Sequence, residues 1–112
     1  MAMGARFDGT LEFQSNGSLE VCGPVQFGSQ GVLFEVLGFE ITDGKNNKVS
    51  HKCNPPVRAG IGEMWETDLD PAAAQNLQPG PGATAKGRGR MYKRTGGSVP
   101  RKWTQDGIVL RA

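Results

Sequence analysis

The sequence predicts an all-β domain, because apolar and polar residues alternate along short segments that glycines separate. Seventeen of the 112 residues are glycine. In the first segment, Phe7, Leu11 and Phe13 fall on one side of the chain and polar residues on the other. A period of two is typical of a half-buried strand, and glycine supplies positive-φ corners. We therefore expect a single β domain over residues 1–112. Its expected form is an antiparallel β-sandwich of about seven or eight strands, immunoglobulin-like in shape, with an open β-barrel as the alternative.

The first two strands are expected near residues 5–14 and 18–27, with a three-residue loop over 15–17 between them. A two-residue turn would set Glu20 against Phe13 and break the apolar face. The longer loop, with Gly17 left-handed in a bulge, restores that face. It gives the cross-strand pairs Phe13–Leu19, Leu11–Val21, Glu12–Glu20 and Thr10–Cys22.

The most apolar stretch, residues 32–42, carries apolar side chains on both faces, which predicts a central strand. Its neighbour follows a polar turn over residues 43–48. The register across this turn places Val49, His51 and Cys53 on the core side of the returning strand.

A further strand is expected over residues 57–69, because Asn54-Pro55-Pro56 should end the strand before it. A short helix is expected near residues 71–77. Asp70 is a favourable cap, and Pro71 suits the first helical turn. Since this helix is too short to form a layer, we expect it to be a crossover between sheets.

The segment Leu77-Gln78-Pro79-Gly80, placed before a new strand, resembles the Leu-x-Pro-Gly connection of fibronectin-type and other immunoglobulin-like sandwiches. The resemblance covers four residues and implies a late strand that begins soon after them. The Cys…Trp…Cys spacing of true immunoglobulin domains is missing, because Trp65 follows both cysteines. The resemblance therefore bears on general shape alone.

The C-terminal part is expected to hold two more strands and a tight hairpin. The strands are placed at 83–94 and 99–104, with a glycine-rich turn between them. An Asp-Gly hairpin over 105–108 would then set Trp103 opposite Leu110.

Charge is distributed unevenly, although the formal net charge is only +2. Residues 1–70 carry ten acids and five bases, whereas residues 71–105 carry seven bases and no acid. In the second range, cations and one aromatic ring share a face of the strand predicted at 83–94. These candidate binding residues are Lys86, Arg88, Arg90, Tyr92 and Arg94. Gly87 and Gly89 take the opposite face, where they should let the ring of Trp65 or Trp103 pack against the backbone.

The basic strand and the loops beside it allow three interpretations. We expect a non-enzymatic interaction module that contacts a protein partner with an acidic surface. The alternative is single-stranded nucleic-acid binding, with cations along the phosphates and Tyr92 stacked on a base. In a purely structural role the face would be solvated, or its charge would be neutralised by a neighbouring strand. The carboxylates considered for that role are Glu63, Glu66, Asp68 and Asp70.

His51 and Cys53 define a second alternative, a small-ligand or catalytic pocket, and together with Cys22 they are three possible zinc ligands. Structural zinc needs four ligands, and the predicted register puts Cys22 on the outer face. His51 and Cys53 are two apart on a strand, so their side chains lie about 6–7 Å apart, too far for direct activation of the thiol. We therefore expect no metal and no cofactor, and favour a binding protein over an enzyme.

The composition predicts a soluble protein of the cytoplasm. No apolar run approaches the ~20 residues of a membrane span, and the first residues hold no signal-peptide core. Two cysteines are too few for a disulfide framework, so we expect free thiols in a reducing compartment.

Overall fold

Eight strands and one short helix make up the computed structural model, which describes residues 6–27, 31–93 and 101–111. In chain order the elements are β1 (Arg6–Phe7), β2 (Gly9–Phe13), β3 (Leu19–Phe27), β4 (Val32–Thr42), β5 (Lys48–Gly60), β6 (Met64–Leu69), α1 (Pro71–Ala74), β7 (Ala83–Lys93) and β8 (Arg101–Arg111).

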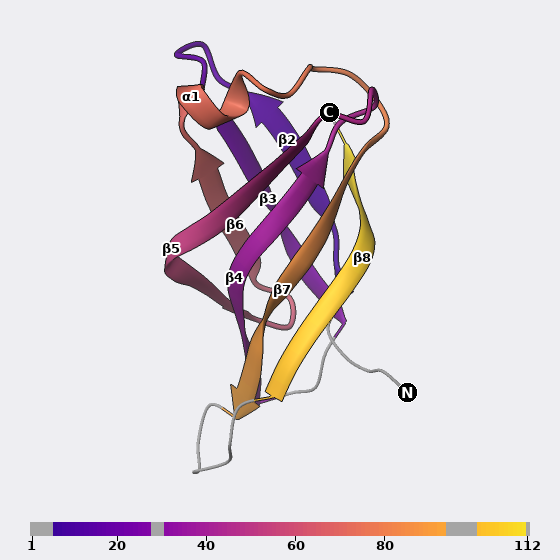
Figure 1. Ribbon diagram of the computed structural model, residues 1–112. Helices are drawn as coiled ribbons and strands as arrows, with labels where there is room; N and C mark the ends of the chain where they lie inside the picture. Colours follow the sequence, from indigo (N-terminus) through magenta and orange to yellow (C-terminus); the bar gives the residue numbers. More distant parts are fainter. Residues whose placement is uncertain (1–5, 28–30, 94–100, 112) are drawn as a thin grey trace.

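The strands belong to one hydrogen-bonded sheet that curves back toward its own start (Figure 1). The strand order is β1-β3-β2-β8-β7-β4-β5, with β6 paired to the other side of β3. β1 and β2 pair with successive parts of β3, so they act as one strand interrupted at Asp8. The sheet therefore forms a nearly closed barrel, and its two edge strands, β5 and β6, approach each other at a seam.

The prediction of an all-β fold, as a sandwich or an open barrel, is confirmed. The single curved sheet has the character of the open-barrel alternative. One pairing departs from the expected antiparallel arrangement, because β2 and β8 run parallel at Gly9–Leu110 and Thr10–Arg111. β2 and β8 lie far apart in the chain and no hairpin joins them, so they are not required to run antiparallel.

The registers expected from turn chemistry are also confirmed. β2 and β3 pair as Phe13–Leu19, Leu11–Val21, Glu12–Glu20 and Thr10–Cys22. Gly17 has a φ of 90°, as the bulged loop requires. The central strand β4 spans the expected range, and Val49 and Cys53 of β5 are buried.

The expected break at Asn54-Pro55-Pro56 is wrong. β5 continues through these residues to Gly60, and the turn at 61–63 then leads into β6. The β4–β5 register shifts between Val36 and Gly38, so the prolines lie in a bulge. Proline is tolerated there because β5 is an edge strand, whose outer N–H groups have no ladder to join.

The expected hairpin at Asp106-Gly107 is wrong too. β8 runs unbroken from Arg101 to Arg111, and Gly107 has a φ of 69°. Opposite it, the β7–β8 register shifts between Ala85 and Gly87. The Asp-Gly pair therefore forms a bulge, which lets β8 pair along β7 and then reach β2. The turn expected at 95–98 lies outside the described residues.

The expected helix is present but shorter, one turn over Pro71–Ala74. Asp70 caps it, accepting a hydrogen bond from the Ala73 N–H at 2.8 Å. The connection from β6 through α1 to β7 crosses one end of the barrel, at the top of Figure 1, so it caps the barrel instead of linking two sheets. β7 starts soon after Gly80, as the resemblance implies, and the immunoglobulin-like shape stays a prediction. In the described part of the chain, no helix has the length and apolar character to cross a membrane.

Aromatic rings fill much of the barrel interior. Phe7 stacks on Trp103 with ring centroids 4.6 Å apart, and Phe39 stacks on Trp65 at 5.0 Å. A Cβ on Gly89 would stand 2.8 Å from Trp103 Nε1, so glycine is what lets this ring lie against β7. The expected packing of a tryptophan against these glycines is confirmed, with Trp103 as the ring.

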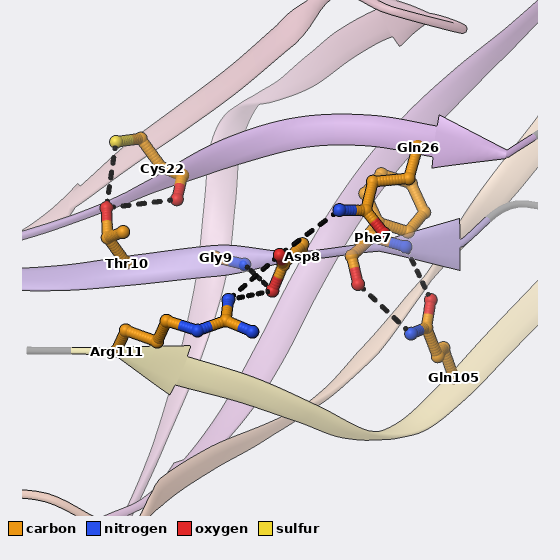
Figure 2. A network of polar contacts seen from close by, with 8 residues as sticks. All are labelled: Phe7, Asp8, Gly9, Thr10, Cys22, Gln26, Gln105 and Arg111. Atoms are coloured by element: carbon orange, nitrogen blue, oxygen red, sulfur yellow. Dashed lines mark hydrogen bonds and ion pairs between the residues drawn. The ribbon is translucent and has the colours of Figure 1, made fainter.

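Over their described residues, β1 and β8 are not joined by backbone hydrogen bonds, and side chains connect them instead (Figure 2). The Gln105 side-chain amide accepts a hydrogen bond from Phe7 N at 2.9 Å and donates one to Phe7 O at 3.3 Å. The Gln105 side chain therefore makes the two hydrogen bonds to Phe7 that the backbone of a neighbouring strand would otherwise make. Close by, Arg111 Nη1 lies 2.8 and 2.9 Å from the two carboxylate oxygens of Asp8. These contacts tie the first strand of the chain to the last.

Candidate functional site

The predicted basic strand is β7, and its cations point outward from the barrel. Lys86, Arg88 and Arg90 are exposed and Tyr92 is half-buried, whereas Arg94 lies outside the described residues. β7 lies between β4 and β8. The acidic strand β6 lies beside β3, so its carboxylates are not the cross-strand neighbours of these cations.

Of the β4 acids that lie opposite the basic strand, Glu35 forms an ion pair with it. It lies opposite Arg90 of β7 on one side and Arg58 of β5 on the other. Arg90 contacts Oε1 through Nε at 2.9 Å and Nη2 at 2.6 Å. Arg58 contacts Oε2 through Nε at 3.1 Å and Nη2 at 3.1 Å. The Glu35 side chain is 4% exposed, but Arg58 and Arg90 are 60% and 47% exposed. One carboxylate therefore orients two guanidiniums that still face solvent.

Arg88 and Tyr92 are held by neighbours as well. A Cβ on Gly38 would stand 2.7 Å from Arg88 Nη2, so the missing side chain lets Arg88 lie across β4. The Arg58 guanidinium lies 5.8 Å from the centroid of the Tyr92 ring, within the range of a cation–π contact. One face of that ring is thus already covered by a cation.

The outer surface of β5, β4, β7 and β8 is called the basic face below. Its exposed cations are Lys48, Lys52, Arg58, Lys86, Arg88, Arg90 and Lys102. The acids on these strands are Glu35, already paired, Glu40, which lies opposite Lys86, and the exposed Asp106 in the β8 bulge. Cations therefore dominate this half of the barrel surface.

The outer surface of β2, β3 and β6, called the acidic face below, carries the opposite charge. Its carboxylates are Glu12, Glu20, Glu66 and Asp68. Glu12, Glu20 and Asp68 form one row across the three strands. Repulsion from Glu66 above all, with burial and the charges of Asp68 and Glu12, raises the pKa of Glu20. The barrel thus presents two faces of opposite sign.

A groove of about 390 Å³ lies between the edge strands β5 and β6. β5 lines it with His51, Lys52 and the proline bulge, and β6 lines it with Glu66, Thr67 and Asp68. His51 Nε2 lies 2.7 Å from Thr67 Oγ1, so a side-chain hydrogen bond bridges the two strands. This groove is called the seam groove below.

The seam groove contains His51 of the predicted small-ligand pocket, while Cys53 is buried behind it. Burial lowers the pKa of His51, and the charges of Asp70 and Asp68 oppose that shift. Burial also raises the pKa of the Cys53 thiol, against the opposing effects of Thr67 and Arg88. A raised thiol pKa is the reverse of what a nucleophilic cysteine requires.

The third possible zinc ligand, Cys22, lies apart from His51 and Cys53. It is on the outer side of β3, with its sulfur 3.5 Å from Thr10 Oγ1. Both cysteines are free thiols. Among the residues that the structure describes, no three His, Cys, Asp or Glu side chains group as metal ligands.

Sequence reasoning missed Glu35 and Arg58. Glu35 is a lone acid between Phe34 and Val36 in the most apolar strand, and a charge in such a place usually has a partner. The sequence therefore indicates a paired Glu35, although not which residue pairs with it. Arg58 offered none, because its pairing with β4 depends on the continuation of β5 through the prolines.

Comparison of the chain with protein-family models, with curated proteins and with solved structures finds no match.

Proposed function

We propose that the chain is a non-enzymatic interaction module that uses its basic face to bind a protein partner with an acidic surface. The observation that carries this proposal is the pairing of the Glu35 carboxylate with both Arg58 and Arg90, which we name the Glu35 clamp. Because Glu35 holds Arg58 and Arg90 in place, these side chains lose little further freedom when they bind an anion. Two oriented guanidiniums match the planar, bidentate geometry of carboxylates.

The alternative, single-stranded nucleic-acid binding, relies on bases stacking on exposed aromatic rings. Tyr92 is the aromatic residue that the strand registers place on the described part of the basic face, and Arg58 already covers one side of its ring. The acidic face on the other half of the barrel would also repel a long phosphate backbone. These features favour a compact acidic protein surface over an extended nucleic acid.

A competition between two anions tests the proposal. The probes are a short poly-glutamate peptide and a mixed-sequence single-stranded DNA oligonucleotide of equal charge, each fluorescently labelled. Binding is followed by anisotropy at increasing salt concentration. We expect the peptide to bind at low salt and to be released as salt rises.

The test variant is Lys86→Glu/Arg88→Glu, which leaves the Glu35 clamp intact. It should weaken peptide binding roughly tenfold or more. The matched control is Lys45→Glu/Lys93→Glu, which reverses two exposed cations outside the basic face. Equal losses in both variants, or no peptide binding at low salt, would refute the proposal. Tighter binding of the DNA than of the peptide would establish the nucleic-acid alternative instead.

A further inference from the structure

The barrel seam leaves two strand edges without a ladder partner. In the described residues, β5 pairs with β4 alone and β6 pairs with β3 alone. β5 bends sharply, as Figure 1 shows on the left, and its register with β4 shifts at the proline bulge. The bridge between them is made by side chains, from His51 to Thr67.

The hairpin bonds identify which backbone groups of β6 face the seam. Gln14 N bonds to Ser18 O at 2.8 Å, and hydrogen-bonded pairs alternate from there along β2 and β3. Glu20 and Cys22 of β3 therefore bond toward β2, and the residues between them bond toward β6. On β6 this directs the N–H and C=O groups of Thr67 into the sheet and those of Glu66 and Asp68 toward the seam.

The same reasoning applies to β5. Asp43 N bonds to Asn47 O at 3.0 Å, which makes the pairs at Val49 and His51 the hydrogen-bonded ones with β4. The backbone groups of Ser50 and Lys52 then point toward the seam. Free backbone donors and acceptors thus face the seam from both of its edges.

The two edges are not equally open to a new strand. A new strand cannot pair along β5, because this strand contains a bulge and because Pro55 and Pro56 have no N–H to donate. β6 is regular over its six residues and carries neither proline nor bulge. It can accept a further strand once the His51–Thr67 contact opens and β5 moves away from β6.

The charges on the acidic face indicate which kind of strand can pair with the edge of β6. Glu12, Glu20 and Asp68 stand in one row across the acidic face, and the next position in that row, beyond β6, is the seam. A second copy of β6 would bring its own Glu66 and Asp68 against this row, so like charges disfavour pairing between two copies. A strand that carries lysine or arginine there would instead place a cation beside each carboxylate.

We propose that the seam groove binds an extended, cationic peptide segment of a partner protein, which adds a strand to the free edge of β6. Backbone hydrogen bonds to Glu66 and Asp68 supply the ladder, and alternate lysine or arginine side chains lie beside the two carboxylates. Side chains on the other face of the segment turn toward His51 and Thr67 in the groove. This inference does not depend on Lys86 or Arg88 of the basic face, although Lys52 of that face lines the groove and opposes the attraction of a cationic segment.

Three blocked peptides of the same length as β6, six residues, test the proposal. The first alternates valine and lysine, the second alternates valine and glutamate, and the third repeats the first with N-methyl groups on the backbone nitrogens of its lysines, which face β6. We expect the lysine peptide to bind and to slow the amide hydrogen exchange of Glu66 and Asp68, measured by NMR. The N-methylated peptide keeps the charge but cannot complete a ladder, and the glutamate peptide is repelled, so both should bind at least about tenfold more weakly.

Charge-reversed proteins complete the test. Glu66→Lys/Asp68→Lys should switch the preference to the glutamate peptide, whereas Glu12→Lys, on the same face but away from the seam, should not. Lys86→Glu/Arg88→Glu should leave binding unchanged, which separates this site from the basic face. Equal binding of the methylated and unmethylated lysine peptides would show attraction by charge alone and overturn the proposal. Unchanged exchange at Glu66 and Asp68 would overturn it as well.

Discussion

At the scale of single residues, Asp43 joins two loops that lie 35 positions apart in the chain. Its buried carboxylate accepts hydrogen bonds from the backbone N–H groups of Lys45 at 2.8 Å, Asn47 at 3.0 Å and Gln78 at 2.8 Å. Burial by itself would raise the pKa of Asp43. The hydrogen bonds, that of the Asn47 side chain first, outweigh it and lower the pKa to about 2.

This shift sets a pH dependence of stability. The folded-state pKa lies below the ordinary value of 3.8, so the contribution of Asp43 is complete above that value and is lost as pH falls toward about 2. We predict that Asp43→Asn is less stable than wild type at neutral pH, and that the difference shrinks as pH falls from about 4 to about 2. Urea unfolding at a series of pH values measures this. The control is Asp106→Asn, at an exposed position. A constant difference across the acid range would disprove the assignment.

Glu35 supports a second prediction at this scale. In Glu35→Ala, Arg58 and Arg90 lose their common acceptor and are left near each other without a counterion. Both guanidiniums remain half-exposed, so hydrogen bonds to water replace part of the lost interaction with Glu35. We expect the free energy of unfolding to fall by about 1–3 kcal/mol. Glu40→Ala, an exposed acid on the same strand, should change it by no more than about 0.5 kcal/mol. Similar values for the two variants, from chemical denaturation, would contradict a structural role for the clamp.

At the scale of elements, β7 combines an outer row of cations with an inner row that contains glycines. Gly89 faces the Trp103 ring and the Glu35 carbonyl, and Trp103 Nε1 donates to Arg90 O at 3.2 Å. A methyl group at residue 89 would collide with both neighbours, one of which is backbone. We predict that Gly89→Ala lowers the free energy of unfolding by about 1–3 kcal/mol or more. The control is Thr84→Ala, at an exposed position of the same strand. Equal melting temperatures for the two variants would count against this packing.

The elements also show how far local sequence signals reach. The β2–β3 register was predictable, because loop length and a shared apolar face decide it within a few residues. The prediction at Asp106-Gly107 was wrong, because an Asp-Gly pair is compatible with either a hairpin or a bulge. Which of the two forms depends on the pairing of β8 with β7 and β2, which are distant in the sequence. The same limit applies to the candidate site. Alternation predicted outward cations on β7, but the Glu35 clamp requires β5, β4 and β7 to be neighbours, which no local pattern reveals.

At the scale of the whole molecule, the barrel is closed on one side by the chain ends and left open on the other at the seam. Gln105 and Arg111 join β8 to the first strand, as Figure 2 shows. Across the seam, by contrast, strands β5 and β6 are bridged by side chains. Strands with a neighbour on both sides have backbone amides that are protected from exchange with water. In the described part of the chain, the two strands at the seam, β5 and β6, each have one edge whose amides are not protected by a ladder.

Amide hydrogen exchange should report this difference as an alternation along β6. We predict slow exchange at Thr67, whose N–H bonds to β3, and fast exchange at Glu66 and Asp68, whose N–H groups face the seam. Glu20 and Val21 of β3 are the internal control, because that strand has neighbours on both sides and both amides should exchange slowly. NMR on the unliganded protein measures all of these together. Uniform protection along β6 would mean that β5 and β6 form a ladder in solution, which would close the barrel and remove the edge on which the seam groove depends.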